Sequence, residues 1–149
     1  MGQTLRTILL AGLICGSLDA LSAVAASAFF GRRPIQVFQG IASGILGVSS
    51  FKGGLGTALL GLGLHFLIAT GASVVFFAAS RVIPSLIDRP LLFGPLYGAA
   101  VHFFMSFVVI PLSAIGPRPF EPRSFVTFLI IAMIVVGPSI ALTVRFYTR

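Results

Sequence analysis

Four long apolar stretches dominate this chain, and the short segments between them hold almost all of its charge. The stretches cover residues 7–30, 57–80, 91–112 and 125–143. A helix needs about 20 apolar residues to cross a hydrocarbon core of about 30 Å, so each stretch can span a bilayer. None alternates apolar and polar residues as barrel strands do, so helices are predicted. The expected fold is an all-α membrane protein, a bundle of four transmembrane helices in one domain over residues 1–149.

Composition leads to the same class of protein. Only 9% of the residues are charged and 57% are hydrophobic, and the mean hydropathy is +1.10. Soluble domains carry about 25% charged residues. The expected partner of this chain is therefore the lipid bilayer. Arg6 and the sequence AVAASA at 23–28 imitate a signal peptide, but Asp19 interrupts its apolar core, so an uncleaved first span is preferred.

The charged residues mark the ends of the predicted spans. Of the thirteen Asp, Glu, Lys and Arg residues, only Asp19 lies inside a span. The basic residues stand singly or in pairs, without the cluster that tracks phosphates, which argues against nucleic-acid binding. Four spans put both termini on one side, and each side then holds five basic residues, so the positive-inside bias leaves the orientation open. These are Arg6, Arg81, Arg89, Arg145 and Arg149 on the side of the termini, and Arg32, Arg33, Lys52, Arg118 and Arg123 on the other.

The segment at 34–48, between the first two spans, has the pattern of a short amphipathic helix. Pro34 stands at a favoured first-turn position. One half of its helical wheel is apolar and the other is polar, which is typical of a helix in the membrane interface. Gly40, Gly44 and Gly47 weaken the helix and leave a re-entrant or capping segment as the alternative. The apolar half is Ile35, Val37, Phe38, Ile41, Ala42, Ile45, Leu46 and Val48, and the polar half is Gln36, Gln39, Gly40, Ser43 and Gly47.

Three ionisable side chains, Asp19, His65 and His102, lie near the middles of the first three spans. A charge at the bilayer centre costs at least ~2.5–3.5 kcal/mol, so such groups are expected to face the bundle and pair with one another. The prediction is a polar cluster at the membrane midplane, with Asp19 bonded to a histidine directly or through water. The cluster either holds three helices together, or forms a proton-linked or ligand-binding site, or supplies His65 and His102 to a haem or metal. The first interpretation is preferred, so no cofactor and no metal are predicted.

Glycine and proline positions predict where the helices touch and bend. Small residues flank the three ionisable groups at helical spacing and let helices approach closely. Residues 61–66 (GLGLHF) and 98–103 (GAAVHF) share the pattern G-x-x-x-H-F. Pro138 predicts a kink in the fourth span, because proline has no N–H to donate four residues back. The predicted packing glycines are Gly12, Gly16, Gly61, Gly94 and Gly98.

Four segments carry a resemblance to a known group: GLICGSLDAL at 12–21, IASGILG at 41–47, LLGLGLHF at 59–66 and PLSAIGPRPF at 111–120. In these the chain resembles small four-span bacterial integral membrane proteins that have no established activity. The resemblance covers nearly the whole chain and implies a multi-pass protein of the bacterial inner membrane. No functional residue carries over from it.

The sequence contains no recognisable catalytic constellation. It has no Cys-x-x-Cys, no phosphate-cradling P-loop and no second carboxylate in a span to pair with Asp19. We therefore expect a non-enzymatic accessory or structural membrane component, for which a membrane protein or a second copy of the chain is a compatible partner. The alternative is a small proton-linked transporter that uses Asp19 with His65 and His102.

Overall fold

The structure is a computed structural model that describes residues 2–149, and it contains helices and no strand over that range. Its four long helical segments are all long and apolar enough to cross a membrane, which confirms the predicted number of spans. Each segment extends beyond the predicted stretch at one or both ends, the third by a single residue. The segments are Gln3–Phe29 (α1), Gly54–Val82 (α3), Pro90–Leu112 and Pro122–Thr148.

The third and fourth spans each contain one π-helical turn. The third consists of α5 (Pro90–Phe104), the π-turn η2 (Met105–Val109) and α6 (Ile110–Leu112). The fourth consists of α7 (Pro122–Ile131), the π-turn η3 (Ala132–Val136) and α8 (Gly137–Thr148). Pro111 and Pro138 follow these turns as the second residues of α6 and α8. Each proline lacks the N–H that would continue an α-helix, and the wider turn accommodates the missing bond.

Shorter elements connect the spans. α2 (Pro34–Leu46) and the 3-10 helix η1 (Gly47–Lys52) link α1 to α3, and α4 (Ser85–Asp88) links α3 to α5. α2 therefore lies where the sequence predicts a short helix. Its side chains are oriented differently from the expected pattern, because the polar Gln39 and Ser43 are buried against the protein while the apolar Ile45 and Leu46 are exposed.

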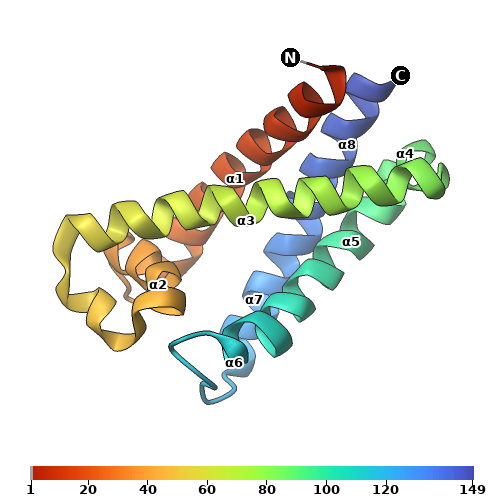
Figure 1. The fold of residues 1–149 in the computed structure, drawn as a ribbon. Coiled ribbons are helices and arrows are strands. Elements are labelled where there is room, and N and C mark those ends of the chain that lie inside the picture. Colours follow the sequence, from red (N-terminus) through yellow and green to blue (C-terminus); the bar gives the residue numbers. More distant parts are fainter. Residues whose placement is uncertain (1) are drawn as a thin grey trace.

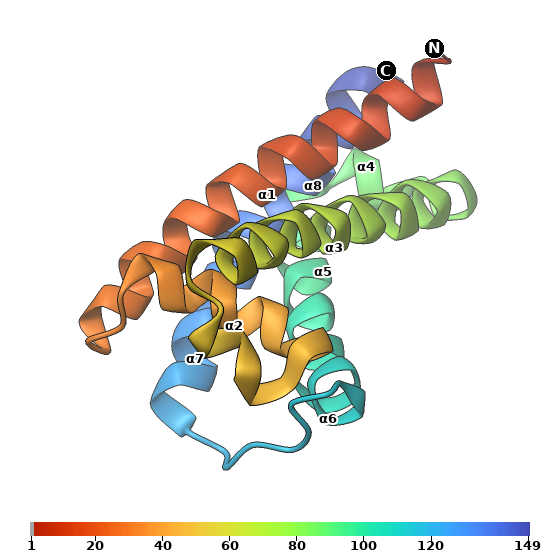
Figure 2. The ribbon, with the colours of Figure 1, turned by 60° about the vertical axis from the view of Figure 1, so that its left-hand side comes forward.

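The helices are arranged so that both termini lie at one end of the molecule (Figure 1). There the side chain of Gln3 donates to the carbonyl of Tyr147 at 2.9 Å, and Arg145 donates to the carbonyl of Asp88 at 3.0 Å. α1 packs beside α8, α2 packs beneath the first half of α3, and α5 packs along α8. α3 and α5 meet at α4 and diverge from it, as both views show (Figures 1 and 2).

Small and polar side chains fill much of the interior, while large apolar side chains cover the outside. Ala11, Ser73 and Ala141 are fully buried, whereas Leu21 and Leu67 are 71% and 67% exposed. This is the reverse of a soluble domain and is expected where lipid is the solvent, because close helix approach rather than apolar burial then stabilises the fold. The four apolar helices and this surface indicate a multi-pass membrane protein.

Candidate functional site

His65 of α3 is fixed against the backbone of α1. Its ring is buried, and Nε2 lies 2.8 Å from the carbonyl oxygen of Gly16. A carbonyl oxygen only accepts hydrogen bonds, so Nε2 must carry the proton and donate it. The His65 ring also packs edge-on against Phe66, with ring centroids 5.6 Å apart. Sequence reasoning expected a carboxylate as the partner of this histidine, and the structure gives it a backbone carbonyl.

Asp19 lies one turn beyond Gly16 on α1 and is partly buried. Gly16 carries the carbonyl that accepts from His65. Within residues 2–149, however, Asp19 accepts no hydrogen bond from another side chain and forms no salt bridge; the salt bridge found there joins Arg149 to Asp88. Asp19 is therefore beside the α1–α3 contact without being bonded into it.

His102 of α5 lies in a different environment. Its ring packs against Phe125 of α7, with centroids 4.7 Å apart, and against Phe103 at 6.4 Å. Its Nε2 atom is buried and has no hydrogen-bond partner in the described part of the chain. An unpaired buried polar atom of this kind costs about 1–3 kcal/mol.

The predicted cluster of Asp19, His65 and His102 is therefore wrong as a single site. No group of three or more Asp, Glu, His or Cys side chains in residues 2–149 is placed to hold a metal. The physical reason is that residues at matching positions along two spans lie at the same depth in the membrane only when the two helices are parallel. α3 and α5 diverge from α4 (Figure 2), so the two histidines point to different neighbours, α1 and α7.

α3 and α5 nevertheless touch through a tyrosine that sequence reasoning missed. The hydroxyl of Tyr97 donates to the carbonyl oxygen of Ala72 at 2.6 Å. The Tyr97 ring packs edge-on against the fully buried Phe76, with centroids 5.0 Å apart. A lone tyrosine inside an apolar span was the available signal, since a buried tyrosine hydroxyl needs an acceptor.

Two of the predicted packing glycines, Gly12 and Gly16, lie buried where α1 meets α3. A Cβ atom on Gly12 would lie 2.8 Å from the Cα of Thr70, and one on Gly16 would lie 2.6 Å from Cδ1 of Phe66. Both distances are shorter than real carbon contacts. Gly16 thus leaves room for Phe66 and presents the carbonyl that His65 needs.

The glycines of the two G-x-x-x-H-F segments also face backbone. A Cβ atom on Gly61 would overlap the carbonyl of Phe38 in α2, and one on Gly98 would overlap the carbonyl of Ala132 in η3. Both residues are buried. In both segments the glycine of this motif therefore lets another helical element approach closely, although the two partner elements are unrelated.

The contact of α5 with α8 is built on a third set of glycines. A Cβ atom on Gly94 would lie 2.9 Å from the Cα of Pro138, and one on Gly137 would overlap the carbonyl of Gly94. Sequence reasoning assigned Pro138 to a kink alone. Gly137 and Pro138 also form the surface against which α5 packs. That role depends on the partner helix, so the sequence of the fourth span gives no signal for it.

A polar network at the other end of α3 was also missed. Ser50 donates to the carbonyl of Gln39 at 2.9 Å, and the Gln39 amide donates to the carbonyl of Gly54 at 3.0 Å. Thr57 closes the network by donating to the carbonyl of Ser50 at 2.6 Å. These bonds explain why the Gln39 side chain of α2 faces inward, because each buried polar group finds a partner there.

The connection from α6 to α7 also holds α2. The amide of Ala114 donates to the carbonyl of Gly44, and Arg118 donates to the hydroxyl of Ser43, both at 2.9 Å. Loss of hydration and the nearby positive charge of Arg32 lower the pKa of Arg118. The guanidinium stays protonated even so, because its ordinary pKa is far above neutrality.

Comparisons of this chain with protein-family models, with curated proteins and with solved structures gave no match. A function for the chain must therefore be argued from its own residues.

Proposed function

We propose that this chain is a non-enzymatic structural or accessory component of a bacterial inner membrane, in which the hydrogen-bonded polar groups inside the spans serve helix packing. The observation that carries the proposal is the bond from His65 Nε2 to the carbonyl of Gly16. A histidine that must keep its proton on Nε2 to hold two helices together is poorly suited to pass protons.

The surroundings of His65 support the same role. The glycines near it, Gly12 and Gly16 of α1 and Gly61 of α3, each lie against the backbone or a side chain of another helix. Two grooves lie at the end of the molecule that carries the termini, and their walls contain neither Asp19 nor a histidine. The haem or metal alternative would need the His65 and His102 rings at one site, whereas His65 bonds to α1 and His102 packs against Phe125 of α7.

The proposal includes an interfacial position for α2. Its exposed side carries Ile45 and Leu46, and Arg32 and Arg33 precede its first residue. Apolar side chains beside basic residues are typical of a helix at the boundary between headgroups and acyl chains. A fluorophore on Ile45→Cys should be quenched by brominated acyl chains, and one on Gly31→Cys should be quenched less. Equal quenching at both positions would contradict the interfacial placement.

A second candidate function, proton-linked transport, is favoured by one observation. Asp19 is the one charged side chain inside the predicted spans, and it has no hydrogen-bond partner among residues 2–149. Ionisable residues inside membranes often mark proton paths. This candidate requires Asp19 to bind and release protons during each transport cycle.

One experiment separates the two functions. Wild-type protein and Asp19→Asn are reconstituted into liposomes with an interior pH dye, and an imposed pH gradient is followed. The structural role predicts that both collapse the gradient no faster than empty liposomes, and that both melt at similar temperatures in detergent, because an amide is nearly isosteric with a carboxyl group. Proton flux in the wild type that Asp19→Asn abolishes, with melting unchanged, would overturn the proposal in favour of transport.

A further inference from the structure

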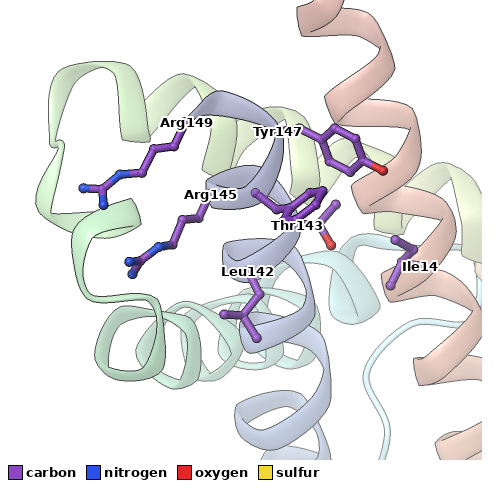
Figure 3. Close-up of a pocket in the computed structure, with 7 residues that line it drawn as sticks. Ile14, Leu142, Thr143, Arg145, Tyr147 and Arg149 are labelled. Carbon is purple, nitrogen blue, oxygen red and sulfur yellow. The ribbon is translucent and has the colours of Figure 1, made fainter.

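Two grooves at the end of the molecule that carries the termini are lined by both arginine and leucine side chains. One, of about 400 Å³, lies between α4, α5 and α8, and the other, of about 630 Å³, continues along α8 toward α1. They share Leu142 and Arg145. Figure 3 shows Arg145 and Arg149 extending from α8 toward the turn between α4 and α5, while Tyr147 points toward α1. The first groove is lined by Asp88, Arg89, Pro90, Leu91, Leu92, Leu142 and Arg145.

The order of residues with depth is the same on both sides of the first groove. α5 runs into the membrane from this end and α8 runs out to it. Arg89 directly precedes α5 and Arg145 lies in the last turn of α8, and in both a leucine stands three residues deeper. The pairs are Arg89 with Leu92 and Arg145 with Leu142. Three residues of helix correspond to about 4.5 Å. The groove therefore has a cationic rim at headgroup level above an apolar wall at acyl-chain level.

The rim carries more positive charge than negative charge. Arg89 and Arg145 line the first groove together with Asp88, and Arg149 lines the second. The carboxylate of Asp88 is paired with Arg149. Arg145 donates one N–H to the carbonyl of Asp88. The Arg89 side chain makes no hydrogen bond to residues 2–149. Since a guanidinium has five N–H donors, most donors of Arg89 and Arg145 remain for a ligand.

We propose that this groove binds the phosphate group of an acidic phospholipid, with Arg89 and Arg145 donating to the phosphate oxygens and one acyl chain lying along Leu92 and Leu142. Arginine forks match phosphate oxygens in geometry. The net positive rim favours a lipid that carries a net negative charge over a zwitterionic one, whose cationic headgroup the arginines repel. Inorganic phosphate offers the same oxygens without the acyl chain, so it should bind far more weakly.

The test is native mass spectrometry of the intact protein released from detergent, after titration with phosphatidylglycerol, with phosphatidylcholine of the same chains, or with inorganic phosphate. We expect roughly thirtyfold tighter binding of phosphatidylglycerol than of phosphatidylcholine, because each of the two arginines near the headgroups contributes about 1 kcal/mol and about 1.4 kcal/mol is a factor of ten in affinity. Inorganic phosphate should neither bind detectably nor displace the lipid at equal concentration. If inorganic phosphate binds as tightly as the lipid, the site is an anion site and the lipid proposal fails.

Variants localise the site. Arg89→Gln/Arg145→Gln should bind both lipids equally, whereas Arg32→Gln/Arg33→Gln removes the same charge from the opposite end and should keep the preference. Because Arg145 also holds α4, Arg89→Gln alone is the second variant, and it should lose several-fold in phosphatidylglycerol affinity while melting like the wild type. An unchanged preference in Arg89→Gln, or equal losses in the variants at the two ends, would overturn the proposal.

Discussion

The segments 61–66 and 98–103 have the same G-x-x-x-H-F pattern, and the structure treats their glycines alike and their histidines differently. Gly61 and Gly98 each lie against a backbone carbonyl of another helical element. His65 donates to the carbonyl of Gly16, while the buried Nε2 of His102 has no partner among residues 2–149. A shared pattern within one chain therefore predicts a shared close approach, but the hydrogen bond depends on what the neighbouring helix presents.

The largest expected effect tests what the two segments share, which is the close approach of their glycines to the backbone of another element. Gly61→Ala and Gly98→Ala should each destabilise the protein by ~2 kcal/mol or more, because the added methyl group meets backbone that cannot turn aside. Gly63→Ala is the matched control, since nothing lies within 4 Å of a Cβ atom there. It should leave the melting temperature in detergent unchanged or slightly raised. The close approach would be disproved if Gly98→Ala melted like Gly63→Ala.

The next effect tests the histidine that is bonded. His65→Phe keeps a ring of similar size but removes the donor to Gly16. It should cost about 0.6 kcal/mol, the average measured for hydrogen bonds between membrane helices, and at most about 1.7 kcal/mol. His65→Gln places an N–H donor near the position of Nε2 and should recover part of the loss. Reversible unfolding in mixed micelles gives both values. If Gln and Phe cost the same, the hydrogen bond contributes nothing.

The smallest effect tests the histidine that is not bonded. His102→Phe removes the unpaired Nε2 and keeps an aromatic ring against Phe125. It should therefore be neutral or stabilising, by up to about 1 kcal/mol, because the cost of burying an unsatisfied nitrogen disappears. The same unfolding experiment measures it. A loss as large as that of His65→Phe would show that His102 has a partner and would remove the contrast between the two segments.

The spans could be predicted from the sequence because apolar length is a local property of the chain. The helix that begins at Pro34 was predictable for the same reason, since its start signal and its pattern lie within about a dozen residues. The side of α2 that faces the protein was not, because burial of Gln39 depends on acceptors at Gly54 and on Ser50, which belong to other elements.

The midplane cluster failed because it was inferred from height along each span. Height says nothing of the direction in which a side chain points, and the way α5 lies against α8 depends on contacts such as Gly94 against Pro138. Such contacts involve two helices at once. The glycines themselves could be found in the sequence, but which helix each one meets could not.

The bond between His65 and Gly16 is most directly tested by nitrogen NMR of the protein in lipid bilayers, with ¹⁵N-labelled histidine and a His102→Phe variant that leaves one signal set. We predict that Nε2 of His65 carries a proton and shows dipolar coupling to a ¹³C label on the carbonyl of Gly16. An Nε2 without a proton, or a ring with no contact to that carbonyl, would contradict the structural role of His65.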